Sequence, residues 1–136
     1  MTWVGEELSR ALSEYGHLET RHINKSAKYL QNRIIAERVE FATSFYGPVG
    51  QVYSAVEAAL QEDMEVIAYW LSRNLPEQSI ELEHPIPKGI MGRGFERSQS
   101  HDWAKGSKQC DYFWVVLSLS DRENSRFYIR TVYPVF

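Results

Sequence analysis

The end of the chain carries two hydroxyl side chains at a spacing that suits the binding of a phosphate. β-branched and aromatic residues dominate residues 128–135, and this composition predicts a strand. Because side chains alternate between the two faces of a strand, Thr131 and Tyr133 are expected to point the same way. Two hydroxyl donors beside a cation can hold a phosphate group. The strand therefore needs a basic partner from elsewhere in the chain.

A cation and a titratable base occur near the other end of the chain. Residues 21–25 read Arg-His-Ile-Asn-Lys, and Arg33 follows on a predicted helix. A neutral histidine such as His22 can accept a proton near pH 7. The guanidinium of Arg33 can donate two parallel hydrogen bonds to a phosphate. If the two ends meet in the fold, they combine a base, a cation and two hydroxyl donors.

Each of these residues also has an ordinary structural interpretation. A histidine beside a helix start commonly caps or packs, and threonine and tyrosine are good strand formers. Arg33 could belong to a surface ion pair. Residues 21–38 hold five cations against one acidic residue, which also describes a solvated helix face. The residue types alone leave both interpretations open.

Composition indicates a globular chain, which we expect to form a single domain over residues 1–136. Of these residues 43% are hydrophobic and 13% aromatic, enough to bury a core. The net charge of −3 argues against general nucleic-acid binding but is compatible with a local basic cleft. Cys110 is the only cysteine, so no internal disulfide can form. No apolar run reaches the length of a membrane span, and the chain does not open with a secretory leader pattern.

Helices are predicted first along the chain and strands later. Apolar residues at helical spacing mark the N-terminal half, where Asn24 or Ser26 is the expected N-cap of the second helix. Trp3, Trp70 and Trp114 are expected in the core. The expected helices cover residues 5–15, 25–38 and 49–74, the last with a break at 61–63.

Beyond Pro76 the pattern changes to strands and turns. Prolines and glycines over residues 85–94 predict turns and bends, and the polar stretch 97–109 predicts a loop. Residues 111–119 are apolar on both faces, which predicts a central strand covered on both sides. The class is therefore α+β, with N-terminal helices packed on a C-terminal antiparallel sheet. The expected strands cover residues 80–83, at a sheet edge, 111–119 and 126–135, with a hairpin loop at 121–125.

The sequence does not support several other kinds of chemistry. There is no phosphate-binding P-loop, and Gly92-Arg93-Gly94 lacks the strand–helix context of a dinucleotide site. One cysteine cannot build a structural zinc site, and the histidines do not have metal-ligand spacing. We therefore expect no metal and no cofactor. The four histidines are His17, His22, His84 and His101.

Several short motifs follow one another in a distinctive order. They are Tyr15-Gly16-His17-Leu18-Glu19-Thr20-Arg21-His22-Ile23-Asn24-Lys25-Ser26, then Leu30 and Arg33, Ala42-Thr43-Ser44-Phe45, Trp70-Leu71, Val115-Val116-Leu117 and Thr131-Val132-Tyr133-Pro134. This order resembles the bacterial ribonuclease A-like toxin domains at the C-termini of contact-dependent growth inhibition (CdiA) proteins and related polymorphic toxins. The resemblance runs from about Tyr15 to the last residue. Asn24 departs from the family, which often has glycine there, and this change is expected to alter a helix cap.

The resemblance implies a ribonuclease A-like fold without disulfides and a metal-independent ribonuclease activity. It also implies a glycine-bearing strand before the Val-Val-Leu strand. It assigns catalysis to His22, Arg33, Thr131 and Tyr133. The residues that we expect to contact RNA around them are Arg21, Lys25, Lys28 and His17. His17, by its nearness in sequence, and Tyr133 are the two candidates for the general acid.

The implied reaction uses the 2′-hydroxyl of RNA as its nucleophile and leaves a 2′,3′-cyclic phosphate. The resemblance further implies the C-terminal domain of a secreted or cell-surface bacterial protein, which acts in the cytoplasm of a target cell. A cognate immunity protein would neutralise it. We expect a monomer, without membrane insertion of this domain. Two alternatives stay open, a non-catalytic RNA- or protein-binding module with a degenerate toxin fold and a metal-dependent nuclease.

Overall fold

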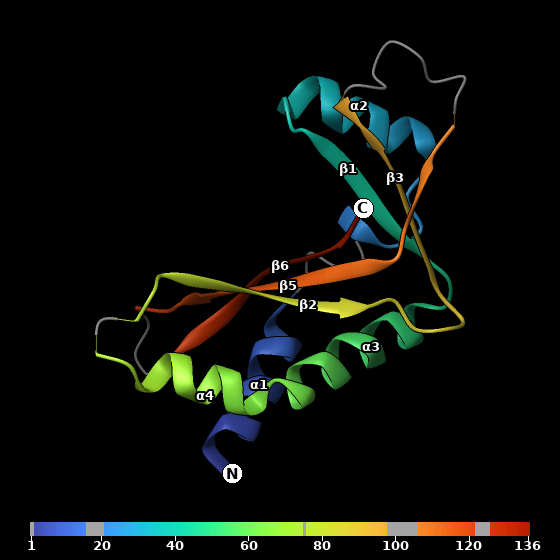
Figure 1. The fold of residues 1–136 in the computed structure, drawn as a ribbon. Coiled ribbons are helices and arrows are strands. Elements are labelled where there is room, and N and C mark those ends of the chain that lie inside the picture. Colours follow the sequence, from blue (N-terminus) through green and yellow to red (C-terminus); the bar gives the residue numbers. More distant parts are fainter. Residues whose placement is uncertain (1, 16–20, 75, 98–105, 122–125) are drawn as a thin grey trace.

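A computed structural model describes residues 2–15, 21–74, 76–97, 106–121 and 126–136 (Figure 1). These residues form four helices and two three-stranded antiparallel sheets, in the strand orders β1-β3-β4 and β2-β5-β6. No helix in this described part is long and apolar enough to cross a membrane. The elements are α1 (Thr2–Glu14), α2 (Ala27–Glu37), β1 (Phe41–Tyr46), α3 (Val49–Glu62), α4 (Met64–Ser72), β2 (Ser79–Pro85), β3 (Met91–Glu96), β4 (Lys108–Cys110), β5 (Tyr112–Leu119) and β6 (Phe127–Val135).

Each sheet has its own helical cover, and the chain itself joins the two sheets. Figure 1 shows α1, α3 and α4 on one side of the β2–β5–β6 sheet, and α2 beside β1 and β3. β4 ends at Cys110 and β5 begins at Tyr112, so a single residue separates strands of different sheets. The two layers are therefore held together through continuous backbone.

Two groups of buried apolar side chains stabilise these layers. The larger group joins α1, α3 and α4 to the β2–β5–β6 sheet. In the smaller group, Leu30 and Ile34 of α2 pack against Ala42 and Phe95. Burying a side chain such as Leu30 contributes roughly 1.5–3 kcal/mol, so α2 is firmly fixed against β1 and β3. The fully buried aromatic members of the larger group are Phe45, Phe113 and Phe127.

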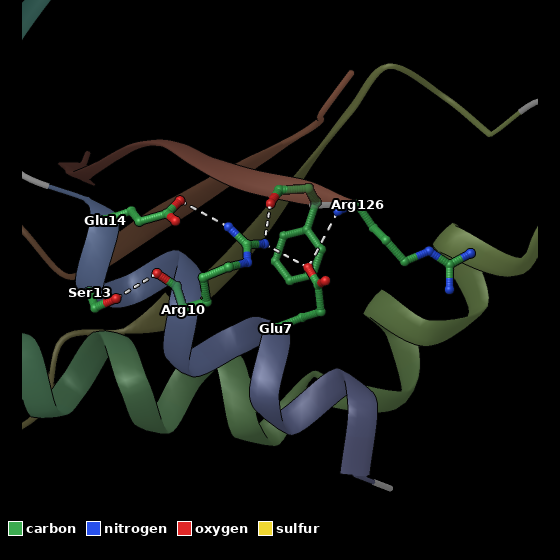
Figure 2. A network of polar contacts seen from close by, with 6 residues as sticks. Glu7, Arg10, Ser13, Glu14 and Arg126 are labelled. Carbon is green, nitrogen blue, oxygen red and sulfur yellow. Dashed lines mark hydrogen bonds and ion pairs between the residues drawn. The ribbon is translucent and has the colours of Figure 1, made fainter. Parts of the chain in front are cut away.

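Arg10 fastens α1 to the start of β6 (Figure 2). Its guanidinium donates to the Phe127 carbonyl oxygen at 2.8 Å. It also pairs with Glu7 at 2.6 Å and with Glu14 at 2.9 Å. Glu7 accepts a further hydrogen bond from the backbone N–H of Arg126 at 3.4 Å. These bonds fix where β6 begins, and therefore where the hydroxyl-bearing end of that strand lies.

Most of the predicted elements are confirmed. Of the two candidate N-caps, Ser26 caps α2, and its side chain accepts a hydrogen bond from the Tyr29 N–H at 3.1 Å. The long helical region breaks at Asp63, between α3 and α4, as predicted. β2 lies at a sheet edge and β5 at the centre, also as predicted. Of the hairpin loop before β6, residues 122–125 lie outside the described residues.

Two expectations from sequence patterns about the middle of the chain are wrong. Patterning predicts turns at Gly92 and Gly94, but both lie inside β3, which agrees with the glycine-bearing strand of the family resemblance. The polar stretch predicts a loop as far as residue 109, but β4 begins at Lys108, and residues 98–105 lie outside the described part. The α+β class is confirmed, although β1 from the N-terminal half also contributes a strand, so the sheet is not confined to the C-terminal half.

The glycines of β3 allow two backbones to approach closely. A Cβ atom on Gly94 would collide with the Ala42 carbonyl oxygen and lie 2.8 Å from the Cα atom of Thr43. A glycine in this sequence context therefore marks a close crossing of β1 and β3 and not a turn. Local patterning could not separate these two meanings, because the colliding atoms are about fifty residues away along the chain.

We predict that Gly94→Ala lowers the free energy of unfolding by about 1–3 kcal/mol, because the added methyl group forces β3 away from β1. Gly50→Ala is the matched control, since nothing lies within 4 Å of its added Cβ atom in α3. This control should stabilise the protein by about 0.4–1 kcal/mol through helix propensity and a stiffer unfolded chain. Urea denaturation measures both values, and equal effects of the two substitutions would contradict the close crossing.

Candidate active site

The two ends of the chain meet in one cleft of about 430 Å³. Its walls come from the segment before α2, from α2 itself, from β1 and from the end of β6. The structure therefore brings together all four residues to which the resemblance assigned catalysis. The charged and polar residues that line this cleft are Arg21, His22, Arg33, Glu40, Thr43, Arg130, Thr131 and Tyr133.

His22 lies at the bottom of this cleft and is only 6% exposed. Its Nε2 atom is 3.4 Å from the hydroxyl oxygen of Thr131, at the long end of hydrogen-bonding distance. The His22 ring also faces Tyr133, with 6.1 Å between the ring centroids. The His22 ring, the Thr131 hydroxyl and the Tyr133 ring thus lie close together, although they are more than a hundred residues apart in sequence.

Asn24 fixes the segment that carries His22 to the end of β1, where its backbone N–H donates to the Phe45 carbonyl oxygen at 2.6 Å. The backbone of Asn24 has a positive φ of 55°, a left-handed conformation that favours glycine and that asparagine tolerates. Its side chain both donates to the Gly47 carbonyl oxygen and accepts from the Gly47 N–H, each at 3.0 Å. The departure from the family's glycine was expected to alter a helix cap, but the cap is Ser26. Asn24 instead shapes the turn after His22.

Arg21 and Arg33 share one carboxylate, that of Glu37. Arg21 reaches Glu37 at 2.7 Å and Arg33 reaches it at 3.2 Å. Burial alone would raise the pKa of Glu37, but the hydrogen bonds from the two arginines outweigh it, so this pKa lies below its ordinary value. Glu37 therefore stays ionised at neutral pH and holds two guanidinium groups at the cleft, which keep an excess of positive charge.

Tyr15 supports the hydroxyl side of the cleft from behind, a role that the sequence analysis did not assign. It is buried, and its hydroxyl oxygen accepts a hydrogen bond from the Val132 N–H at 3.0 Å. Burial raises the pKa of Tyr15, while hydrogen bonds with the Thr131 side chain and the Val132 backbone act in the opposite direction. Tyr15 thus ties the end of α1 to the residue that contacts His22.

Tyr133 forms an aromatic wall with its neighbours. Its ring centroid lies 5.7 Å from that of Phe41 and 6.1 Å from that of Trp114. Burial raises the pKa of the Tyr133 hydroxyl, and the negative charge of Glu81 adds to this effect. The hydroxyl consequently stays protonated throughout the neutral range and can donate a hydrogen bond.

The expectation that Trp114 lies in the core is wrong. Its side chain is partly exposed, and its indole N–H donates to Glu83 at 2.8 Å. β5 is covered on one face by the helices, whereas Trp114 and Tyr112 on the other face are partly or largely open. Trp70 is buried as predicted, and the side chain of Trp3 lies outside the described part.

The other residues expected to contact RNA have different positions. Lys25 lies over the ring of Tyr29, 5.1 Å from its centroid, and Lys28 is exposed on α2. Neither lines the cleft, so their contact with RNA stays a prediction. His17 lies outside the described residues. No group of three His, Cys, Asp or Glu side chains that could hold a metal ion occurs among the residues described.

A second cavity, of about 450 Å³, lies between α1 and the α3–α4 region. Its described lining mixes apolar and polar side chains and contains no histidine or arginine. It shares Tyr15 with the support of the first cleft, but its described lining includes Glu57 and no cation that could hold a phosphate. The arginine-lined cleft is therefore the better candidate for chemistry.

Comparisons with known proteins agree on one family. A family model described as the bacterial CdiA-CT RNAse A domain matches residues 16–134. A solved structure, described as the crystal structure of a CdiA-CT/CdiI complex from Y. kristensenii, is similar in fold, with a TM-score of 0.70 and 21% sequence identity. The similarity covers 88% of this chain and 99% of that chain. No curated protein matches the sequence.

We predict that Thr43→Val lowers the free energy of unfolding by about 1–3 kcal/mol, because the buried Thr43 hydroxyl donates to the Pro134 carbonyl oxygen at 2.7 Å and joins β1 to β6. Thr43→Ser keeps this donor and reports the loss of one methyl group, worth about 0.8 kcal/mol. Chemical denaturation of the three proteins measures the difference. A Thr43→Val protein as stable as the wild type would mean that this bond does not hold the two sheets together.

Proposed function

The chain belongs to the bacterial CdiA-CT RNAse A domain family, and on this basis we propose that it is a metal-independent endoribonuclease toxin. The observation that carries the proposal is the convergence of His22, Arg33, Thr131 and Tyr133 on one cleft. These residues supply a base, a cation and two hydroxyl donors. RNA brings its own nucleophile, the 2′-hydroxyl, so no metal-bound water is needed for cleavage.

In the proposed reaction His22 acts as the general base. Its neutral ring takes the proton of the 2′-hydroxyl, whose oxygen forms a bond to the adjacent phosphorus. The bond from phosphorus to the 5′-oxygen of the next nucleotide then breaks. The products are a 2′,3′-cyclic phosphate and a 5′-hydroxyl end. The contact of 3.4 Å between the His22 ring and the Thr131 hydroxyl supports a shared phosphate site.

Arg33 and Thr131 stabilise the charge that develops on the phosphate oxygens. The Arg33 side chain is 14% exposed, so its guanidinium acts in partly desolvated surroundings, where its hydrogen bonds to an oxyanion are stronger. Two parallel N–H donors match the geometry of phosphate oxygens. Glu37 holds this guanidinium in place before RNA arrives.

Tyr133 is the residue within the described part that we assign as general acid. Its raised pKa keeps the hydroxyl protonated at neutral pH, so a proton is available for the leaving 5′-oxygen. The same shift makes Tyr133 a weak acid, so its hydroxyl first donates a hydrogen bond to the 5′-oxygen and transfers the proton as the bond from phosphorus to that oxygen breaks. His17 remains the alternative from sequence, outside the residues described.

The proposed biological setting is bacterial competition. The similar solved structure is titled as a complex of CdiA-CT with CdiI, which supports a cognate immunity protein for this chain as well. We propose that the domain belongs to a secreted or cell-surface protein and cleaves RNA in the cytoplasm of a target cell. An immunity protein with an acidic surface would cover the arginine-lined cleft, because opposite charges favour that contact. The domain itself is proposed to act as a monomer.

We predict that His22→Ala lowers RNA cleavage at least about a hundredfold while the protein stays folded, as expected for loss of a general base. Tyr133→Phe removes one oxygen and should also impair cleavage. Tyr128→Phe is its matched control, because Tyr128 lies on the same strand, is 43% exposed and does not line the cleft. Cleavage of total RNA is measured by gel, with circular dichroism to verify folding.

The same assay in excess EDTA separates the three classes of function. Full wild-type cleavage in EDTA supports the proposal, and loss of cleavage would indicate a metal-dependent nuclease. A folded wild-type protein that binds RNA but never cleaves it would indicate a non-catalytic module. Undiminished cleavage by His22→Ala would remove the proposed base.

We further predict that Arg33→Lys reduces cleavage by at least about tenfold although the charge is kept, because an ammonium group cannot donate the paired hydrogen bonds of a guanidinium. Arg73→Lys, at the end of α4 and outside the cleft, is the control for the substitution itself. The measured quantity is kcat/KM on a fluorescent oligonucleotide. Wild-type kinetics of Arg33→Lys would mean that Arg33 serves only as a point charge.

A further inference from the structure

A β-bulge changes the direction of one side chain on β6. Val116 of β5 pairs with Thr131, and Leu117 pairs with Ile129, so Arg130 has no partner residue on β5. In a regular strand Arg130 and Thr131 would point to opposite faces. A bulge breaks this alternation and re-aims the extra residue. As a result, both Arg130 and Thr131 line the cleft.

Arg130 differs from the other two arginines of the cleft in its contacts. Arg21 and Arg33 both bind Glu37. Arg130 is exposed, and within the described part of the chain it makes no hydrogen bond or ion pair. Its guanidinium therefore keeps its full set of donors for a ligand, whereas those of Arg21 and Arg33 are partly used.

Arg33 and Arg130 lie at different depths of the cleft. Arg33 is mostly buried near the bottom, with a 14% exposed side chain, and Arg130 is exposed at the rim. The Cα atoms of the neighbouring residues Arg130 and Thr131 are about 3.8 Å apart. A phosphate that is held by Thr131 and Arg33 would therefore leave Arg130 free to reach a neighbouring phosphate of the same strand.

We propose that Arg130 forms a second phosphate-binding subsite, which takes the phosphate of a nucleotide next to the one that is cleaved. The inference rests on the proposed ribonuclease function, because it places that phosphate relative to the scissile one. Binding of a phosphate at this subsite favours substrates that have flanking phosphates. The enzyme would therefore cleave within an RNA chain more efficiently than it cleaves a dinucleotide without terminal phosphates. Its charge-assisted hydrogen bonds are of the kind that contribute most to binding.

The test compares substrates that differ only in a terminal phosphate. A dinucleoside monophosphate is assayed alone, with an added 5′-phosphate and with an added 3′-phosphate. For the wild type, one terminal phosphate should raise kcat/KM by about tenfold, mostly through KM, in line with one charge-assisted contact. In Arg130→Gln this ratio between the two substrates should fall to near one. Arg73→Gln, which removes a distant exposed charge, should keep the wild-type ratio.

Two outcomes would overturn the subsite. One is a wild-type ratio near one for both terminal phosphates, and the other is an unchanged ratio in Arg130→Gln. If the wild type cleaves no substrate, the ribonuclease proposal fails first, and calorimetry with the matching 2′-deoxy dinucleotides then decides on the subsite. A terminal phosphate that strengthens binding to the wild type but not to Arg130→Gln supports it, and equal affinities overturn it. Thermal unfolding of each variant verifies that the fold is kept.

Discussion

The contact between β1 and the end of β6 is the constraint on which the site depends. The two strands belong to different sheets, and the Thr43 hydroxyl joins them by donating to the Pro134 carbonyl oxygen. Both residues are buried, so water cannot replace this bond. Phe41 and Tyr133 extend the same contact by packing their rings. Because the segment with His22 is pinned to β1, this junction sets the distance between the base and the hydroxyl groups.

The cleft is rich in positive charge although the protein as a whole is negatively charged. The chain carries a net charge of −3, yet three arginines line the cleft. Glu37 neutralises part of this cluster and at the same time orients Arg21 and Arg33. Such an arrangement reduces repulsion between the arginines in the free protein, and it leaves a positive potential at the surface that an anionic ligand would meet. A small acidic protein can therefore present a local site for phosphates.

Several supporting residues act from a distance in sequence and could not be assigned from motifs. Tyr15 bonds to the backbone of β6 from the end of α1, and Arg10 fixes the start of the same strand. Neither residue type is unusual at a helix surface, and the spacing of α1 marks only its apolar face. Their importance follows from the position of β6, which no local pattern of α1 contains. At 21% identity to the similar solved structure, the shared fold shows that many side chains can differ while these layers persist.

Local periodicity was sufficient to determine much of this protein from its sequence. The alternation of β6 placed Thr131 and Tyr133 together, the cap and apolar spacing defined α2, and the polar interruption near Asp63 divided α3 from α4. These features depend on residues close in the chain, whose spacing fixes which face they occupy.

Only the tertiary structure decided the pairing of β1 with β3, the placement of Gly94 inside a strand and the bulge that turns Arg130 toward the cleft. The same holds for the partly open position of Trp114 and the left-handed backbone of Asn24. Each of these features is set by atoms that are remote along the chain. A glycine, an arginine or an asparagine has the same local pattern whether or not another strand passes close by, so the physical reason for its conformation lies outside its own segment.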